Sequence, residues 1–309
     1  MLASGENQMT AWQQFSNEIR EVVDQAGKSI VAVDGRAEHT SSGIVWRRDS
    51  VLTAAHSIRR ETNIGVIFGP GRSVAGRLLG RDRGTDIALL KLDQDIEMQP
   101  VQFGSTQELA VGEFTVAVAR TRRGNIVASA GIISGLMGEW HVARTRIDQF
   151  IRPDLYLYPG FSGGALLDGR GGVLGLNTSG LIRGKPITIP SSTLSRIAEE
   201  IAATGHVARP YIGVVMQPVE IPESLQKKAG VNANAGLLVM HVESGGPADQ
   251  AGVLLGDLLL DMEGQSFSDL EDVYQALGQK GAGQEVQTSL IRGGQRLQLT
   301  IRVGDRPPR

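Results

Sequence analysis

The chain has 309 residues, of which 41% are hydrophobic and 21% charged, a composition typical of soluble globular proteins at a length that suits two domains. Its 31 basic and 33 acidic residues give a net charge of −2, so the chain has no overall basic field with which to hold nucleic acid. It contains no cysteine, which excludes disulfides, cysteine-based zinc sites and a cysteine nucleophile.

The expected location follows from the apolar pattern. The sequence contains no run of about 18 apolar residues, so we expect no membrane span. The first residues, Met1–Asn7, contain neither the basic region nor the apolar region of a signal peptide. As the sequence stands, we expect a cytoplasmic protein; the alternative is a periplasmic or other extracytoplasmic one, if an upstream signal was removed.

The first expected element is an amphipathic helix over residues 11–27, in which Trp12, Phe15 and Ile19 recur at helical spacing. Its aromatic residues either pack onto the adjoining domain or form an interface between subunits. From residue 29 to about 189, short apolar runs alternate with turns containing Gly, Asp and Arg. This pattern predicts a β-sandwich or β-barrel, with strands at 29–33, 42–46, 51–55, 63–68, 87–92, 114–118, 126–133 and 172–176.

A second helix is expected over residues 191–203, with Ser191 or Ser192 as its cap and Gly205 at its end. Residues 205–210 contain Gly and Pro and form the best candidate for a domain boundary. The second unit is expected to contain a helix at 269–277 and strands at 212–215, 237–242, 258–262, 286–291 and 297–303. The chain is thus predicted to consist of an N-terminal helical segment (1–27), a β-rich domain (28–205) and a smaller α+β domain (206–309).

Three local motifs carry the chemistry, in the chain order His, Asp, Ser. The run Thr53-Ala-Ala-His56 follows a strand, Asp86 opens the buried strand Ile87–Leu92, and Ser162 lies in the glycine-rich run Pro159-Gly-Phe-Ser162-Gly-Gly. A serine hydroxyl is a poor nucleophile unless a base removes its proton, and histidine can take and return that proton near neutral pH. A buried carboxylate orients the imidazole, and glycine-flanked amides can stabilise an oxyanion. The sequence therefore predicts a catalytic triad of His56, Asp86 and Ser162.

At these residues the chain resembles the HtrA/Deg family of trypsin-like serine proteases with PDZ domains. The resemblance covers residues 28 to 303 and includes Gly-Leu-Asn177-Thr-Ser-Gly and Ile-Thr-Ile-Pro190 after the serine. It implies a mainly β fold, a chymotrypsin-like double β-barrel of two six-stranded barrels followed by a PDZ domain. It also implies ATP-independent cleavage of unfolded or damaged proteins, with no metal and no cofactor, by an enzyme that assembles as a homotrimer.

The same resemblance implies roles around the triad. The oxyanion hole would use the amides of Gly160 and Ser162, with that of Phe161 nearby. The substrate main chain would pair with the strand containing Asn177, Thr178 and Ser179, while Tyr156 and Tyr158 would shape the pocket for a small aliphatic side chain. Two features depart from the family pattern: Phe161 replaces the usual Asn before the catalytic serine, and the regulatory loop at residues 34–42 is short.

In the second domain the resemblance rests on Tyr211-Ile-Gly-Val214 and on the run from Ser244 to Asp257. A PDZ domain binds a peptide C-terminus beside a strand, with the terminal carboxylate on successive backbone amides. The residues expected to form this peptide site are Tyr211, Ile212, Gly213, Val214, Met216, Val273 and Leu277.

Two other functions compete with proteolysis. In the first the chain is a chaperone whose protease site is mostly resting. In the second it is a peptide-binding scaffold in which the PDZ domain alone is functional.

Overall fold

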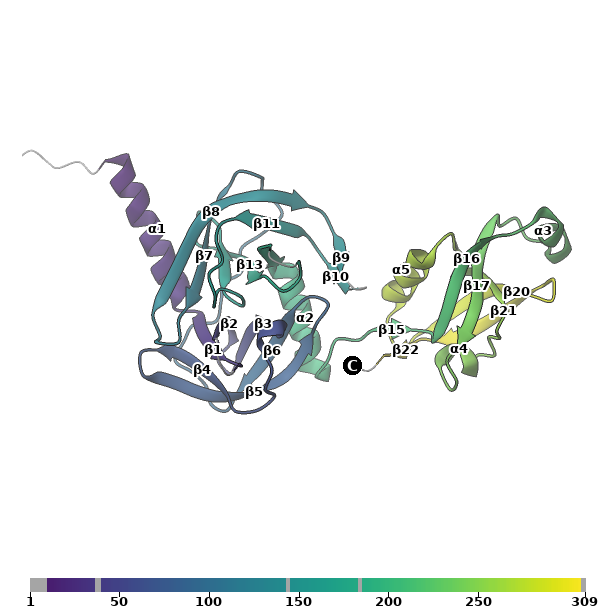
Figure 1. Ribbon diagram of the computed structural model, residues 1–309, viewed down its shortest axis with the longest axis horizontal. Helices are drawn as coiled ribbons and strands as arrows, with labels where there is room; N and C mark the ends of the chain where they lie inside the picture. The colour runs from purple at the N-terminus through teal and green to yellow at the C-terminus, as the bar shows by residue number, and fades with distance from the viewer. Residues whose placement is uncertain (1–9, 37–39, 143–144, 183–184, 307–309) are drawn as a thin grey trace, which may run out of the picture. The chain divides into compact units, whose positions relative to one another are not determined.

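The computed structural model of the protein describes residues 10–36, 40–142, 145–182 and 185–306. The chain divides into two compact units, Met1–Val207 and Ala208–Arg309. In the first unit the strands close into two six-stranded barrels, and in the second they form an open sheet (Figure 1). The expectation of a mainly β chain with a double barrel is confirmed.

The first barrel brings residues 56 and 86 to the same edge. Its strands pair in the order β1 (Ile30–Asp34), β2 (Ser41–Arg47), β3 (Ser50–Ala54), β6 (Ile87–Leu92), β5 (Arg72–Asp82) and β4 (Ile64–Gly69). In the antiparallel β3–β6 pair, Ala54 lies opposite Ile87. The residues that follow β3, a short 3₁₀ turn over Ala55–Ser57, therefore lie beside the residue that precedes β6.

The second barrel supplies the serine loop. Its strands pair in the order β11 (Phe150–Asp154), β14 (Ile187–Pro190), β13 (Val173–Thr178), β12 (Ala165–Leu167), β7 (Phe114–Arg120) and β8 (Ile126–Met137). A short hairpin of β9 (Trp140–Val142) and β10 (Thr145–Ile147) follows β8. The loop between β11 and β12 contains Ser162, and β13 ends at Thr178, beside that loop.

Three apolar clusters hold the first unit together. Along β6, Ala88 and Leu90 point into the first barrel, whereas Ile87 and Leu89 join a larger cluster that includes residues of the second barrel. This strand is buried on both faces, which explains why its sequence is a continuous apolar run rather than an alternating one. A third cluster fills the second barrel and includes Phe161.

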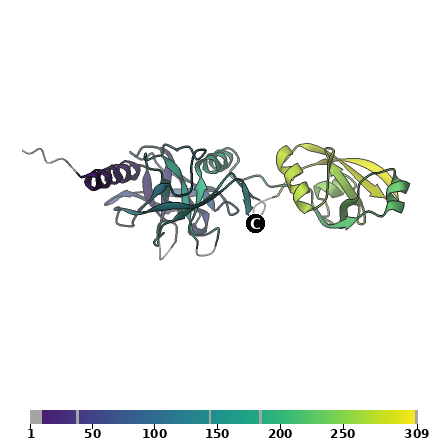
Figure 2. The same cartoon turned by 90° about the horizontal axis from the view of Figure 1, so that it is seen from above.

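Two helices flank these barrels. Helix α1 (Ala11–Gly27) has the expected bounds, begins with a capping box between Thr10 and Gln13, and lies outside both barrels (Figures 1 and 2). Helix α2 (Ser191–Thr204) packs against strands of both barrels and ends at Gly205, which has a φ of +81°. The expected serine cap of α2 is wrong, because Pro190 precedes the helix and no side chain caps it.

The second unit is built on a six-stranded sheet. Five of its strands pair in the order β16 (Val214–Glu220), β17 (Ala235–Val242), β18 (Leu258–Met262), β20 (Glu285–Arg292) and β21 (Gln295–Arg302), and the sixth, β19 (Gln265–Ser266), pairs with β18. Its helices are α3 (Glu223–Ala229), α4 (Pro247–Gln250) and α5 (Leu270–Lys280). Strands β15 (Pro210–Tyr211) and β22 (Gly304–Asp305) pair and bring the two ends of the unit together. Its core includes Ile212, Leu237, Phe267, Val273 and Leu277.

Candidate active site

The imidazole of His56 is held by the carboxylate of Asp86. His56 Nδ1 lies 2.6 Å from Asp86 Oδ2, and the His56 backbone N–H donates to Asp86 Oδ1 at 2.7 Å. The Asp86 side chain is 6% exposed and that of His56 is 30% exposed, so the carboxylate is enclosed while the ring reaches solvent. A carboxylate can only accept hydrogen bonds, so this contact fixes the proton on Nδ1 and leaves Nε2 free to act as a base.

The backbone at Asp86 is unusual. Its φ is +59°, in the left-handed region that few residues other than glycine adopt, although aspartate and asparagine tolerate it best. The Asp86 carbonyl also accepts a hydrogen bond from the Ala55 amide at 2.9 Å. Asp86 is thus tied to the His56 turn through its main chain as well as its side chain.

Ser162 lies in a turn that requires glycine. At Gly163, which has a φ of +88°, an added Cβ would lie 2.0 Å from the Ser42 carbonyl oxygen, so only glycine fits. The Ser162 Oγ lies 3.2 Å from the Ser179 Oγ. Within the described residues no hydrogen bond joins Ser162 to His56, so the hydroxyl contacts Ser179 in this conformation.

The segment Thr178–Gly180 contacts all three candidate catalytic residues. The Thr178 hydroxyl donates to Asp86 Oδ2, and the Ser179 hydroxyl meets Ser162. Gly180 packs against the imidazole so closely that a Cβ there would lie 2.5 Å from His56 Nδ1. Three side chains predicted from separate motifs therefore converge on three consecutive residues at the C-terminal end of β13.

This arrangement changes the roles expected for two residues of the substrate strand. Asn177 is fully buried; its side chain donates to the Ala165 carbonyl and accepts from the Thr188 hydroxyl, each at 2.8 Å, so this side chain faces the protein interior. The Thr178 side chain is also fully buried and supports Asp86 instead of facing substrate. Only Ser179, the third residue of that expectation, is exposed.

The turn before Ser162 presents two unpaired amides. In the described part of the chain, neither the Gly160 N–H nor the Ser162 N–H donates a hydrogen bond. The Phe161 N–H, in contrast, donates to the Tyr158 carbonyl at 3.0 Å and is therefore not available to an oxyanion. Gly160 has a φ of +99°, which a residue with a Cβ adopts only with strain.

Phe161 and the two tyrosines form a row of rings. Tyr156 and Tyr158 are 65% and 55% exposed, with ring centroids 4.5 Å apart, and Tyr158 lies 5.8 Å from Phe161. The Phe161 ring is only 3% exposed and packs in the core of the second barrel. The row thus runs from solvent beside the serine loop into the barrel interior.

The peptide site expected in the second unit has two parts. Val214 and Met216 on β16 are half-buried, whereas Ile212, Val273 and Leu277 are core residues. The carbonyls of Ile212 and Gly213 accept from Ala248 and Glu243, but their amides donate no hydrogen bond within the described residues. Tyr211 pairs with Gly304 in the short β15–β22 ladder, and its ring lies under the Arg306 guanidinium.

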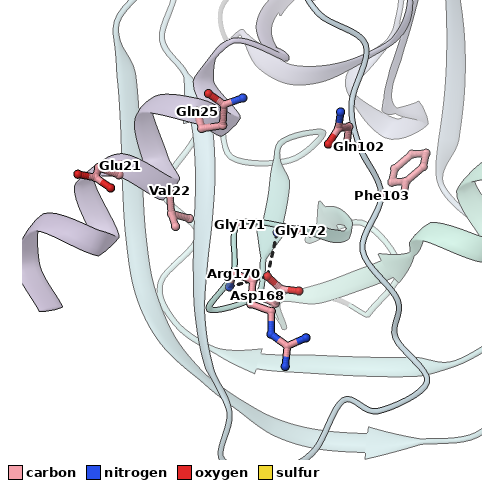
Figure 3. A pocket seen from close by; sticks show the side chains of 9 residues that line it. All are labelled: Glu21, Val22, Gln25, Gln102, Phe103, Asp168, Arg170, Gly171 and Gly172. Carbon is pink, nitrogen blue, oxygen red and sulfur yellow. Dashed lines mark hydrogen bonds between the residues drawn. The ribbon is translucent and has the colours of Figure 1, made fainter.

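A further cleft lies away from these sites. Its volume is about 470 Å³ and it lies between α1 and the β12–β13 turn, lined by Glu21, Val22, Gln25, Gln102, Phe103, Asp168, Arg170, Gly171 and Gly172 (Figure 3). Asp168 shapes the turn, since its Oδ1 accepts from the amides of Arg170 and Gly172, both at 2.8 Å. None of the candidate catalytic residues lines this cleft.

Two further observations concern cofactors and membranes. Among the described side chains no group of three His, Asp or Glu residues is arranged to hold a metal ion. No described helix is both long and apolar enough to cross a membrane.

Two six-stranded barrels with a His–Asp pair on one and a serine turn on the other define a trypsin-like serine peptidase. Residues 41–176 match the model of the trypsin-like peptidase domain, and residues 210–303 match that of the PDZ domain.

Similar proteins are known by sequence and by structure. "Putative serine protease HhoA" of Synechocystis sp. is 32% identical over 277 residues, 85% of this chain and 70% of that protein. A "Probable periplasmic serine endoprotease DegP-like" of Halomonas elongata is 29% identical over 86% of this chain and 56% of its own length. The HtrA-type protease AlgW, solved with a decapeptide, has a TM-score of 0.71 and 25% identity over 96% of this chain and 99% of that one. The serine endoprotease of Yersinia pestis has a TM-score of 0.72 and 25% identity over 93% and 98%.

The chain therefore belongs to the HtrA/Deg family of trypsin-like serine proteases, with one PDZ domain. It is a serine endopeptidase, as the three motifs predict.

Proposed function

We propose that Ser162, His56 and Asp86 are the catalytic triad of an endopeptidase that acts in protein quality control. The observation that supports this most directly is their convergence on Thr178–Gly180. Ser162 Oγ attacks the peptide carbonyl while His56 Nε2 removes its proton, and His56 then returns that proton to the leaving amine. Asp86 holds the imidazole by Nδ1 and stabilises the imidazolium that forms.

The tetrahedral intermediate places its negative charge on the former carbonyl oxygen. We assign the amides of Gly160 and Ser162 as the donors for that oxygen, because both lack a partner and lie on either side of Phe161. A single donor of this kind typically contributes about 100- to 1,000-fold to turnover. Water then releases the acyl group by the same proton transfers in reverse order, so the chemistry needs neither ATP nor a metal.

Substrates would bind in extended form along Ser179 and Gly180. These residues are exposed and continue β13, so their main chain offers the edge on which a peptide could pair. Tyr156 and Tyr158 would border the pocket for the side chain before the scissile bond. Unfolded or damaged proteins fit such a site because their chains can adopt the extended form that pairing with a strand edge requires.

The proposed domain boundaries are 28–205 for the protease and 206–309 for the PDZ domain, after the helical segment 1–27. The PDZ domain would receive peptide C-termini, with the carboxylate on the amides of Ile212 and Gly213 and side chains against Val214 and Met216. The similar protease AlgW was solved with a decapeptide, which supports a peptide ligand for this chain as well.

Helix α1 supports a proposed homotrimer. Its C-terminal half packs onto the barrels through Ile19 and Val22, and the Phe15 ring contacts Phe114 at 5.3 Å. Trp12, one turn earlier, is 77% exposed. A large aromatic ring left in water is typical of a subunit interface, so Trp12 would contact a second copy. Light scattering should give three times the chain mass, and a smaller mass for Trp12→Ala.

An extracytoplasmic location is proposed from the periplasmic relatives such as that of Halomonas elongata. Cell fractionation tests it: the protein should leave the cell with the periplasmic fraction, and recovery in the cytosol would contradict it.

Casein digestion tests the proposed function. The wild-type protein should digest casein and the Ser162→Ala variant should not. Equal digestion by both would exclude Ser162 as the nucleophile. A wild-type protein that suppresses aggregation of unfolded substrate but neither digests casein nor reacts with a fluorophosphonate would instead be a chaperone.

A further inference from the structure

Ser42, a fully buried residue of β2 in the first barrel, makes hydrogen bonds with every polar group it has. Its backbone N–H donates to the Ser162 carbonyl at 2.9 Å, and its carbonyl accepts from the Thr53 hydroxyl at 2.7 Å. Its hydroxyl donates to the Gly160 carbonyl at 2.8 Å and accepts from the Arg120 backbone N–H at 3.0 Å. One residue of the first barrel thus holds two carbonyls of the serine turn in the second.

The direction of the hydroxyl contact is fixed by its surroundings. The Arg120 amide can only donate, so it takes a lone pair of the Ser42 oxygen and leaves the Ser42 proton for a carbonyl. Of the two carbonyls within reach, that of Gly160 at 2.8 Å is the better acceptor, because that of Arg120 lies 3.5 Å away. That amide is itself well anchored, because the Arg120 guanidinium donates to the carbonyls of Gly27, Ile30 and Gly124 at 2.6–2.7 Å. The acceptor and the donor of the Ser42 hydroxyl are therefore both set by the fold.

The opposite side of the turn is held by Phe161. Its ring is buried in the second barrel, and its amide donates to the Tyr158 carbonyl. With the carbonyls of Gly160 and Ser162 directed to Ser42, and the amide of Phe161 directed to Tyr158, only the amides of Gly160 and Ser162 are left without a partner in the described part of the turn.

We propose that Ser42 is a positioning residue for the oxyanion hole, acting through the Gly160 carbonyl. This inference rests on the proposed catalytic role of Ser162. If the Gly160 carbonyl lost its partner, the peptide group that joins Gly160 to Phe161 could rotate, because the glycine backbone has little conformational restriction. Rotation would misalign the donors that an oxyanion needs, and donors are effective only when they are held in place before the charge develops.

The test is a comparison of Ser42→Ala with Ser41→Ala. Ser41 is the preceding residue of β2, also buried, but its hydroxyl has no hydrogen-bond partner among the described residues. Both variants remove one buried hydroxyl from the same strand, and only one removes the contact with Gly160. The assays are steady-state hydrolysis of a peptide substrate, the rate of fluorophosphonate labelling and the melting temperature.

We expect Ser42→Ala to lower kcat and the labelling rate by about 10- to 100-fold, because donors misplaced by about 1 Å lose that much. KM should stay within about threefold, since the lost interaction acts on the transition state rather than on substrate binding. Ser41→Ala should keep wild-type kcat. If kcat of Ser42→Ala stays within about twofold of that of Ser41→Ala, the inference is overturned.

If Ser42→Ala does not fold, Ser42→Cys decides, because a thiol fills the same site but is a weak hydrogen-bond donor. We expect at least a fivefold loss of kcat, on the order of the 1 kcal/mol that a hydrogen bond contributes. Wild-type kcat in Ser42→Cys would overturn the inference. Ser162→Ala serves as the inactive control in every assay. Activity in Ser162→Ala would refute the proposed nucleophile. An inactive Ser162→Ala together with a fully active Ser42→Ala would refute only the role of Ser42.

Discussion

Replacing Asp86 by asparagine should invert the tautomer of His56. Oδ1 of Asp86 accepts from the His56 backbone N–H, a group that can never accept, so the oxygen of an asparagine would keep that position. The new NH₂ group would then occupy the Oδ2 position, 2.6 Å from His56 Nδ1. An NH₂ group there needs an acceptor, and the ring supplies one only by moving its proton to Nε2. An imidazole protonated on Nε2 cannot take the proton of Ser162.

The expected effect of Asp86→Asn is a loss of about 10⁴-fold in kcat, or about 5–6 kcal/mol in the barrier, the size found when a triad aspartate is changed in this way. The Thr178 hydroxyl loses its acceptor at Asp86 but still accepts from the Gly180 amide, so the fold should survive. Peptide hydrolysis gives kcat, and circular dichroism gives the melting temperature.

Asp168→Asn is the matched control for this substitution. Asp168 also accepts two backbone amides, but it lies in the β12–β13 turn and lines none of the catalytic site. Its variant should keep wild-type kcat. An Asp86→Asn variant that folds and retains more than a tenth of wild-type kcat would refute the reasoning, because it would show that the imidazole does not need this carboxylate.

Three further predictions concern other contacts. Ser179→Ala should speed fluorophosphonate labelling of Ser162 by about 2- to 10-fold, since it removes a competing hydrogen bond of about 0.5–1.5 kcal/mol; slower labelling would contradict this. Gly163→Ala should abolish labelling and lower the melting temperature, because its Cβ would lie 2.0 Å from a carbonyl oxygen of β2; a stable, active variant would be incompatible with the turn described. Backbone hydrogen bonds at the start of α5, foremost that from Ser268, hold the pKa of Asp272 below its usual 3.8, so its contribution to stability is present above that pH and is lost as the pH falls through its lower folded-state pKa. Asp272→Asn should therefore lower the melting temperature at pH 7, and its difference from the wild type should shrink as the pH falls below 3.8; a loss that stays equal at every pH would contradict the assignment.

The triad could be predicted because each member lies in its own local motif. Apolar strands before His56 and after Asp86, and glycines around Ser162, restrict the backbone within a few residues, so a single sequence contains the signal. The helix at 11–27 was predictable for the same reason: its apolar residues recur at helical spacing.

What the sequence could not reveal depends on contacts between distant segments. Strand β5 (Arg72–Asp82) was not predicted, because glycines and arginines interrupt its apolar pattern. Asn177 finds its partners only when β12 and β14 pair with β13, and Thr178 supports Asp86 only when the two barrels meet. Ser42 carries no local sign of its contact with Gly160, which is 118 residues away.

The most direct test of the account is to map the fluorophosphonate adduct by peptide mass spectrometry. The wild-type protein should carry one adduct, on Ser162, and the Asp86→Asn variant should carry almost none. An adduct on Ser179, whose hydroxyl lies 3.2 Å from that of Ser162, or digestion of casein by a protein that takes up no adduct, would contradict the assignment of the nucleophile.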